Sequence, residues 1–277
     1  MITFNSLGRF GKLGNQMFQY AALFSLAKNK NYTFGIPLQN TEWGISAWYD
    51  CKLFLPSIFN ITAPNSNSVE NKYQFRYEKL TFNPVFFELP DNIDLLGYFQ
   101  SEKYFKHCKQ ELLKEFTFKN TNLVDEIKEE FKNKKFIGVH IRRGDYLKLP
   151  HIHKTCNQDY YLRSLDYIQS NIKDEMYLYI FSDDIEWCKK NINFNSNIKI
   201  FFDDSPESED KYYTNQEKTL IKMSLCDHFI CANSSFSWWG SYLISNPNKL
   251  TCMPDQWFGP AINENWSDIY YDGVKIL

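Results

Sequence analysis

Two arginines and an aspartate follow an apolar run near the middle of the chain. The run is KFIGVHI at residues 135–141, and Arg142, Arg143 and Asp145 come after it. Side chains alternate across a strand, so a strand here would turn His140 and Arg142 to one face and Arg143 to the other. A guanidinium presents a fixed fork of donors that fits phosphate oxygens, and it keeps its charge at working pH. The segment therefore predicts that Arg142 neutralises a diphosphate, that Arg143 faces the protein, and that Asp145 orients an arginine or takes a proton.

Two alternatives for these charged residues stay open. The arginines could be locked in structural ion pairs, because such networks also gather charge. Their candidate partners are the aspartates of two DD pairs, Asp183, Asp184, Asp203 and Asp204. The RGD sequence could instead be a surface adhesion loop, although short motifs often match by chance.

A second group of polar residues lies between an apolar run and an aromatic helix. The segment CANSSFSWWG at 231–240 places Asn233, Ser234 and Ser235 at this junction. A helix N-terminus presents unpaired N–H groups and a partial positive charge, and serine hydroxyls can also donate, so the junction predicts a diphosphate site. The alternative is an ordinary serine N-cap.

A third group lies close to the N-terminus. The segment GKLGNQMFQ at 11–19 places Asn15 at the expected start of a helix, after a glycine-rich turn. Asn15 could serve a site from this helix end, or it could simply be the N-cap, with the glycines making the turn.

The chain offers little for a metal ion. Its seven cysteines are scattered and never spaced as C-x-x-C, which argues against both a disulfide framework and a zinc ribbon. The tightest cluster is His151, His153 and Cys156, one ligand short of the four that structural zinc usually takes. We therefore expect no metal site.

The second half of the chain predicts a parallel, doubly wound sheet. Apolar runs at 135–141, 176–181, 197–202, 227–232 and 249–253 are typical of buried strands, and helix-like segments separate most of them. In such sheets ligands bind beyond the carboxyl ends of the strands, where the arginine and serine segments would lie.

The first half begins with a β-α-β pattern. We expect a strand at 1–7, a helix from about Asn15 to Asn29, and a second strand at 32–37. The pattern from Gln39 to about Asp91 is irregular, and the Lys/Glu-rich, helical segment 101–134 leads towards a domain junction. The predicted fold is α/β with two Rossmann-like domains, residues 1–130 and 131–277.

Composition narrows the class of protein. The 277 residues carry a net charge of −2 and a pI near 6.2, so no general electrostatic attraction to nucleic acid or anionic membrane is expected. No apolar run reaches the ~18 residues of a membrane span, and the start of the chain lacks the pattern of a signal peptide. A cytoplasmic enzyme fits best, with peripheral attachment at the inner face of the membrane as an option.

The three groups together resemble a known family. GKLGNQMFQYA, HIRRGDY and ANSSFSWWG are similar, in order and spacing, to the signature segments of the inverting α1,2-fucosyltransferases, which are related more distantly to α1,6- and protein O-fucosyltransferases. The resemblance covers nearly the whole chain, as far as the PDQWFG and NENWSDIYY segments. It implies a GT-B fold of two facing Rossmann-like domains, with GDP-fucose held mainly by residues 131–277, the acceptor on the side of residues 1–130, and no cofactor or metal.

The resemblance also implies roles for single residues. Arg142 resembles the arginine on the donor β-phosphate and His140 a nucleotide contact, while Asn233, Ser234 and Ser235 match the loop around the diphosphate. Asn15 resembles the asparagine that reaches the reaction centre from the first domain. The expected reaction transfers L-fucose with inversion to a galactoside hydroxyl of a galactose-terminated glycan, with Asp145 as the candidate general base.

One departure and two rival functions remain. Where relatives often carry an acidic residue that accepts from the guanine edge, this chain has Thr219, with Glu217 two residues away, so the choice of GDP over ADP is less secure. The nearer rival is another fucosyl linkage or another GDP-sugar transferase, because fold and donor motif do not set the acceptor. The rival from another class is a non-catalytic carbohydrate-binding protein, whose aromatic residues would stack on sugars.

Overall fold

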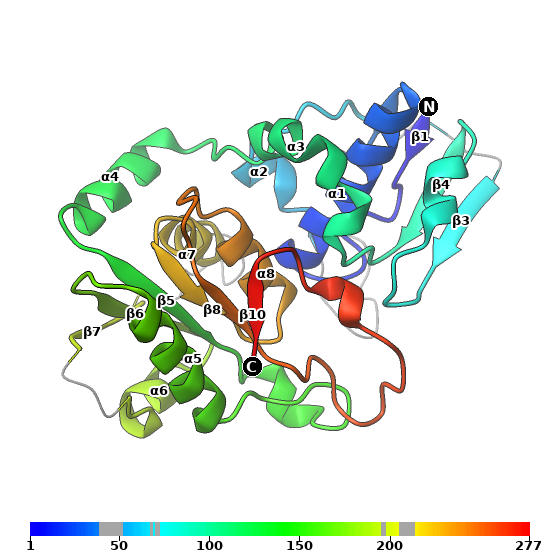
Figure 1. Cartoon of the computed structure of the whole chain (residues 1–277). Helices are drawn as coiled ribbons and strands as arrows, with labels where there is room; N and C mark the ends of the chain where they lie inside the picture. The colour runs from blue at the N-terminus through cyan, green and yellow to red at the C-terminus, as the bar shows by residue number, and fades with distance from the viewer. Residues whose placement is uncertain (39–51, 67–68, 70–72, 195–197, 205–213) are drawn as a thin grey trace. The chain divides into compact units, whose positions relative to one another are not determined.

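The computed structural model describes residues 1–38, 52–66, 69, 73–194, 198–204 and 214–277 (Figure 1). The chain forms two compact units. The first contains Met1–Asn120 and Glu264–Tyr271, and the second contains Thr121–Asn263 and Asp272–Leu277. Of the seven cysteines, Cys51 lies outside the described residues.

The first unit is built on a four-stranded parallel sheet. Its elements are β1 (Ile2–Thr3), α1 (Leu13–Lys30), β2 (Phe34–Gly35), α2 (Leu55–Ile58), β3 (Tyr73–Tyr77), η1 (Pro84–Glu88), β4 (Ile93–Gly97), η2 (Glu102–Tyr104), η3 (Lys106–Cys108), α3 (Lys109–Glu115) and η5 (Ser267–Ile269). The strand order is β2-β1-β4-β3. The predicted β-α-β start is confirmed, although the helix begins at Leu13 rather than Asn15, and the N-cap residue is Lys12.

Helix α1 is buried around most of its circumference, so its polar residues need partners inside the unit. Gln16 Nε2 donates to the carbonyl of Lys52 (2.7 Å), and Gln16 Oε1 accepts from the N–H of Phe54 (2.9 Å). The turn before the helix requires glycine, because Gly8 and Gly11 have φ of +92° and +95°. The helix therefore fixes the loops around it.

Strands β3 and β4 fall in or beside the segment that the sequence marked as irregular. Strand β3 is a largely exposed edge strand. In β4 the apolar pattern is broken by Asp94, which is buried and accepts from Thr3 Oγ1, the N–H of Asn5 and Gln74 Nε2. From the sequence alone, a carboxylate at this position favours a loop. In the structure the same carboxylate links neighbouring strands through its hydrogen bonds.

The second unit holds a six-stranded sheet in which every strand is parallel to its neighbours. Its elements are α4 (Thr121–Phe131), β5 (Phe136–Ile141), η4 (Asp145–Lys148), α5 (Gln158–Asn171), β6 (Tyr177–Ser182), α6 (Ile185–Asn191), β7 (Ile200–Phe202), α7 (Thr214–Ser224), β8 (His228–Ile230), α8 (Ser235–Tyr242), β9 (Thr251–Met253) and β10 (Val274–Ile276). The strand order is β10-β9-β8-β5-β6-β7. The five predicted strands and the helices between them are confirmed, and β10 was not predicted.

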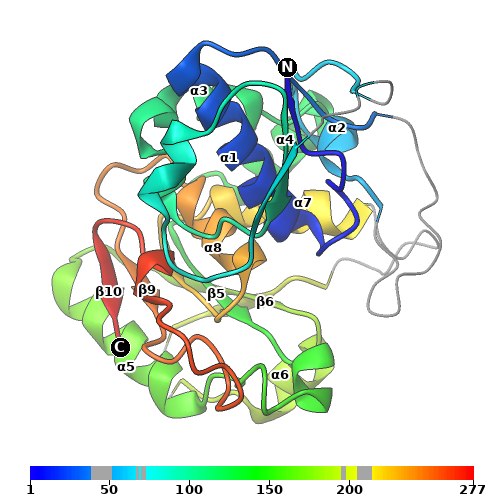
Figure 2. The same ribbon diagram turned by 90° about the vertical axis from the view of Figure 1, so that its right-hand side faces the viewer.

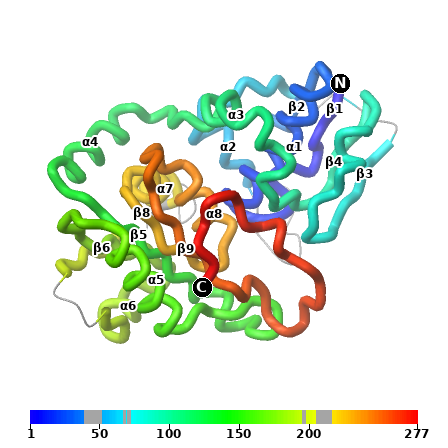
Figure 3. The backbone as a smooth tube through the Cα atoms, in the orientation of Figure 1, coloured from blue at the N-terminus to red at the C-terminus, as the bar shows by residue number. Residues whose placement is uncertain are grey.

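Helices cover both faces of this sheet. Figures 1 and 2 show α5 and α6 on one side of the strands and α7 and α8 on the other, and Figure 3 traces the same path as a tube. The side chains of β5 alternate accordingly. Ile137, Val139 and Ile141 pack into the core beneath α5 and α6, whereas His140 lies against Phe236 of α8. The predicted doubly wound α/β architecture is confirmed for this unit.

The two units divide at residue 120, before the junction expected near residue 130. The difference is helix α4, which packs with the second unit because the Phe131 ring contacts Phe136 and Tyr179. In the other direction, Glu264–Tyr271 returns to the first unit, where Asp268 pairs with Lys103 (2.5 Å) and accepts from the N–H of Phe82 (2.7 Å).

Within the described part of the chain, none of the helices combines the length and the apolar character needed to cross a membrane. The cytoplasmic location stays a prediction from the sequence.

Candidate functional site

The strand order of the second unit marks one position for ligand binding. From β5 the chain moves through β6 to β7 on one side, and the later strands β8, β9 and β10 lie on the other side. Ligands of doubly wound sheets bind at the carboxyl ends of the strands where the order reverses in this way. This switch point lies between β5 and β8. The segments HIRRGDY and ANSSFSWWG lie there, at the carboxyl ends of these two strands.

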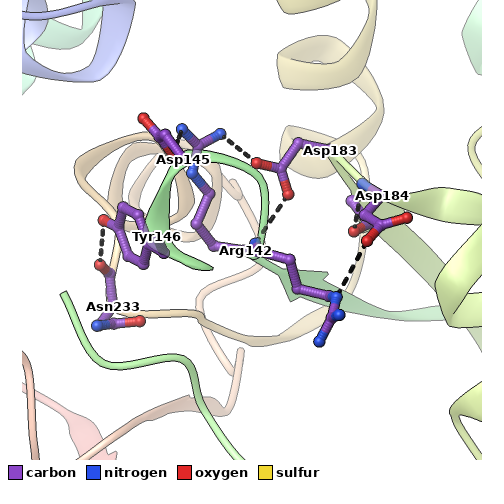
Figure 4. Close-up of polar contacts among 8 residues, drawn as sticks. Arg142, Asp145, Tyr146, Asp183, Asp184 and Asn233 are labelled. Atoms are coloured by element: carbon purple, nitrogen blue, oxygen red, sulfur yellow. Dashed lines mark hydrogen bonds and ion pairs between the residues drawn. The ribbon is translucent and has the colours of Figure 1, made fainter. Parts of the chain in front are cut away.

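Arg142 stands at this edge, held between two carboxylates (Figure 4). Its Nη2 donates to Asp145 Oδ1 at 2.5 Å, and its Nη1 lies 2.9 Å from Asp183 Oδ2. The side chain is 18% exposed, and its buried Nε has no hydrogen-bond partner among the described residues. Burial acts to lower the pKa of Arg142, but Asp183 and Asp145 outweigh it, so the guanidinium stays charged. Arg142 therefore does form ion pairs within the protein, as the alternative held. Its guanidinium still has N–H groups that can donate to a ligand.

Asp183, at the carboxyl end of β6, binds both arginines of the turn that follows β5. Its Oδ1 accepts from the N–H of Arg143 at 2.9 Å while Oδ2 takes the Arg142 guanidinium. A Cβ on Gly144 would lie 2.4 Å from Oδ2, so only glycine lets the turn pass this close. The sequence named Asp183 as an ion-pair candidate but gave no sign of this central position.

Arg143 faces the protein, as predicted. Its Nε lies 3.2 Å from Asp184 Oδ2, and its guanidinium lies 3.3 Å from the centre of the Trp187 ring on α6. His140 packs on the opposite side of the sheet, against Phe236. The two residues thus point in the opposite directions that strand alternation predicts.

His140 is buried and neutral beside the arginine. It is 5% exposed, and burial, followed by the charge of Arg142, lowers its pKa to about 3. Its Nδ1 has no hydrogen-bond partner among the described residues. A buried polar atom without a partner is unusual, so His140 keeps an unused hydrogen-bonding group next to the arginine.

Asn233 organises the loop after β8. Its Nδ2 donates to the carbonyls of Lys154 (2.7 Å) and Trp257 (2.8 Å), so both amide hydrogens are used inside the unit. Its own carbonyl accepts from the hydroxyl of Tyr146 at 2.9 Å (Figure 4). Tyr146 also lies 5.3 Å below the Arg142 guanidinium. The sequence did not predict this tyrosine, which joins the loops after β5 and β8.

The N-terminus of helix α8 follows directly. Ser234 is the N-cap residue, as the alternative held, but its side chain makes no capping hydrogen bond. The N–H groups of Ser235, Phe236 and Ser237 have no acceptor among the described residues, whereas Ser237 Oγ accepts from the N–H of Ala232 at 3.0 Å. Free N–H groups at a helix N-terminus form an anion site.

The His/Cys cluster of the sequence has other partners. His153 stacks on Tyr146 with ring centres 4.3 Å apart, and Cys156 Sγ lies 3.6 Å from Asn233 Oδ1. Over the residues that the structure describes, no three His, Cys, Asp or Glu side chains form a group that could hold a metal ion. A metal-free reaction stays a prediction.

The residues considered for the guanine base lie on α7. Thr219 Oγ1 donates to Asp203 Oδ2 at 2.7 Å, and Lys222 Nζ donates to Asp203 Oδ1 at 3.0 Å. Glu217 keeps a buried Oε1 with no hydrogen-bond partner among the described residues, and burial raises its pKa. Of the two candidates, Glu217 is the one with an unused polar atom.

Asn15 belongs to the first unit. It lies in the first turn of α1, and its Oδ1 accepts from Gln100 Nε2 at 2.7 Å. It is therefore not the N-cap residue. The structure brings together Arg142, Asp145, His140 and the serine loop in one unit, and a part for Asn15 at the same reaction centre stays a prediction.

Comparison with known sequences identifies the family. Residues 2–263 match the model of glycosyl transferase family 11. An alpha-1,2-colitosyltransferase of Escherichia coli is 30% identical over 270 residues, which covers 90% of each chain. A galactoside alpha-(1,2)-fucosyltransferase 2 of Hylobates lar is 28% identical over 264 residues, covering 88% of this chain and 69% of the relative.

Comparison with solved structures identifies the fold. The NodZ alpha-1,6-fucosyltransferase soaked with GDP-fucose superimposes with a TM-score of 0.55 at 13% identity, covering 89% of this chain and 96% of that one. POFUT1 in complex with GDP also reaches 0.55, at 11% identity, with coverage of 91% and 97%. These similarities confirm the predicted GT-B fold class. With the family match over nearly its whole length, the chain belongs to glycosyl transferase family 11.

Proposed function

We propose that this enzyme transfers L-fucose from GDP-β-L-fucose to a hydroxyl of a galactoside, forming an α1,2 linkage with inversion. Membership of family 11 supports glycosyl transfer, and relatives named as α1,2-fucosyl and α1,2-colitosyl transferases support the linkage. The observation that carries the proposal is the meeting of Arg142 and the α8 N-terminus at the switch point between β5 and β8.

The diphosphate of the donor would bind between these two groups. Arg142 offers Nε and the unused hydrogens of its terminal nitrogens, and α8 offers the N–H groups of residues 235–237 together with its partial positive charge. His140, held neutral by burial, would contact the nucleotide through its free Nδ1. Asn233 would act by shaping the loop, because its amide hydrogens are already donated.

These groups would also supply the catalysis. As the bond between fucose C1 and the diphosphate breaks, negative charge grows on the β-phosphate. Donors that bind this oxygen more strongly in the transition state than in the ground state lower the barrier. Arg142 is preset for this role, since Asp183 fixes one end of its guanidinium. We propose that this arrangement works without a metal ion.

Asp145 is the proposed general base, and its present contact with Arg142 has to change when the donor binds. Nη2 of Arg142 now donates to Asp145 Oδ1, so a donor phosphate and Asp145 compete for the same nitrogen. Asp145 is the more exposed of the two carboxylates on the arginine, 40% against 24% for Asp183. It is therefore the partner that can move away when the donor binds and turn to the acceptor hydroxyl.

The test is a transfer assay with defined products. The purified protein is incubated with GDP-fucose and lactose, and the product linkage and anomeric configuration are read by NMR. We expect an α1,2-linked fucosyl lactose together with GDP release. Binding of sugar but not of GDP would indicate a non-catalytic carbohydrate-binding protein instead, and would overturn the proposal.

A second transferred sugar follows from the 30% identical relative. That relative is named a colitosyltransferase, so colitose is the alternative to fucose. The same assay with GDP-colitose separates the two, and a clear preference for it would correct the sugar while leaving the donor site as proposed.

A further inference from the structure

His153 lies beside the donor site of the second unit but has no part in the chemistry proposed above. Its imidazole stacks on the Tyr146 ring, with the ring centres 4.3 Å apart and an angle of 11° between the planes. The Arg142 guanidinium lies 5.3 Å from the centre of the same Tyr146 ring. Tyr146 therefore contacts both the arginine and an imidazole, the side chain whose charge changes most readily near neutral pH.

The loop that carries His153 is attached to its surroundings on both sides of this residue. The carbonyl of Ile152 accepts from the N–H of Gly259 at 2.7 Å. The carbonyl of Lys154 accepts from Asn233 Nδ2, also at 2.7 Å. The position of His153 is therefore fixed relative to Asn233, the residue that organises the loop after β8.

Two charged side chains act on His153 with opposite effects. Burial is the largest cause and lowers the pKa of His153, the charge of Asp145 raises this pKa, and the charge of Arg142 lowers it. Phe258, whose ring centre lies 6.4 Å from that of His153, adds no charge. The imidazole is therefore mostly neutral at pH 7, and a further charge placed beside Arg142 would change how readily it takes up a proton.

A bound diphosphate supplies such a charge. Arg142 already lies between the carboxylates of Asp145 and Asp183, so these three side chains carry one negative charge in excess. The diphosphate of a nucleotide sugar adds two more negative charges, whereas a helix N-terminus offers only about half a positive charge. Added negative charge favours the protonated form of a nearby histidine.

We propose that His153 is a positioning residue that takes up a proton from solvent when a diphosphate binds at Arg142. The imidazolium would balance the added negative charge and that of the Asp145 carboxylate, which the diphosphate displaces from the arginine. The inference rests on the proposed function and deepens it, because it assigns to the donor site a titratable residue outside the segments 11–19, 139–146 and 231–240. By reciprocal linkage, the donor should bind more tightly as the pH falls from 8 to 6.

The first experiment follows the imidazole itself by NMR. The Hε1 resonance of His153, assigned by its absence from His153→Phe, is titrated between pH 5.5 and 8.0 in the free protein and with saturating GDP-fucose. The diphosphate of GDP-fucose is esterified at both ends, so it does not titrate in this range. We expect the midpoint for His153 to move to higher pH in the complex. His151, which is exposed and two residues away, is the internal control and should move less.

The second experiment measures GDP-fucose affinity by calorimetry at pH 8.0 and 6.0. Affinity should rise about three- to fivefold at the lower pH in the unaltered protein and in the matched control His151→Phe. In His153→Phe, which keeps an aromatic ring on Tyr146 but cannot take up a proton, the affinity should change much less. Repeating the titrations in buffers of different ionisation enthalpy should show net proton uptake on binding, with less uptake in His153→Phe.

The outcomes separate this inference from the proposed function. An unmoved His153 titration in the GDP-fucose complex, or an equal pH dependence of affinity in His153→Phe, would overturn the inference whether or not fucose is transferred. A moved titration in a protein that binds GDP-fucose but transfers no fucose would overturn the proposed function alone. Absence of GDP-fucose binding would overturn both.

Discussion

At the scale of single residues, the charge around Arg142 decides how a diphosphate can bind. Two carboxylates already lie on the guanidinium, so an incoming phosphate must either use the remaining N–H groups or displace one carboxylate. Asp183 also holds the N–H of Arg143, whereas Asp145 makes one contact to the arginine. Displacement of Asp145 is the less costly route, because a partly exposed ion pair contributes little to stability.

Replacing Arg142 by lysine tests the planar fork while keeping the charge. A lysine cannot hold Asp183 and a phosphate oxygen in one plane, so we expect turnover to fall roughly 10²-fold, about 3 kcal/mol, and GDP affinity to fall less. The matched control is Arg143→Lys, which loses the stacking on Trp187 and should lower the melting temperature with a smaller effect on turnover. Near-normal turnover in Arg142→Lys would show that the arginine acts only as a diffuse charge.

Replacing Asp145 by asparagine separates its two proposed actions. The neutral side chain competes less for Nη2 of Arg142, so GDP should bind up to about fivefold more tightly, the value of a partly exposed ion pair. Turnover should fall by at least 10² because the general base is lost. Calorimetry with GDP and initial-rate assays check the two effects. Unchanged GDP affinity together with normal turnover would contradict both roles.

The sequence predicted which residues belong to this site, but it did not predict most of the contacts between them. Arg142, Asp145 and His140 come together because one strand and its following turn carry all three. Asp183 and Tyr146 act through pairing between strands and loops that lie 40 and 87 residues apart in the chain, and no local pattern encodes such pairings. The aspartate pair after the apolar run at 176–181 was the one available sign.

At the scale of elements, the loops after β5 and β8 form one structure. The Tyr146 hydroxyl donates to the Asn233 carbonyl, and the Tyr146 ring contacts both His153 and Arg142. A diphosphate that contacts Arg142 and the α8 N-terminus therefore depends on this link, because the link keeps the two groups at a fixed distance from each other.

Removing the link should loosen both sides of the site. Tyr146→Phe loses a hydrogen bond of about 1 kcal/mol, so the melting temperature should fall by about 2–4 °C and GDP should bind more weakly. Tyr177→Phe is the control in the same unit, since the Tyr177 hydroxyl has no partner among the described residues. Equal effects of the two substitutions on GDP affinity would contradict a linking role for Tyr146.

The elements that the sequence missed share a physical cause. Strand β3 is exposed along an edge, so it lacks the apolar run that marks the strands of the second unit. Strand β4 carries the buried Asp94, and β10 is three residues long and gains its place by pairing with β9. In each case long-range pairing, and not local pattern, makes the strand.

At the scale of the whole molecule, the proposed chemistry needs no metal ion. Arg142 and helix α8 would supply the positive charge that the leaving diphosphate requires. We therefore expect full turnover in excess EDTA, measured as GDP release with lactose as acceptor. A large loss of turnover that magnesium or manganese restores would show that the donor is bound through a cation.

Stability should fall in mild acid because three partly or fully buried histidines resist protonation in the folded chain. Burial lowers the pKa of His140 to about 3, and it also lowers the pKa of His153 and His228. An unfolded chain takes up these protons near pH 6.5, so the stabilisation is complete above that pH and is lost as the pH falls below it.

For His140 alone the loss approaches about 1.4 kcal/mol per pH unit between pH 6.5 and its folded pKa. Urea unfolding followed by tryptophan fluorescence from pH 7.5 to 4.5 measures this slope. His140→Gln removes the titrating group and should flatten the profile even if the variant starts from a lower stability. The same slope in both proteins would show that the pKa of His140 is the same in the folded and the unfolded chain, so that in mild acid His140 would add a positive charge beside Arg142 in the donor site.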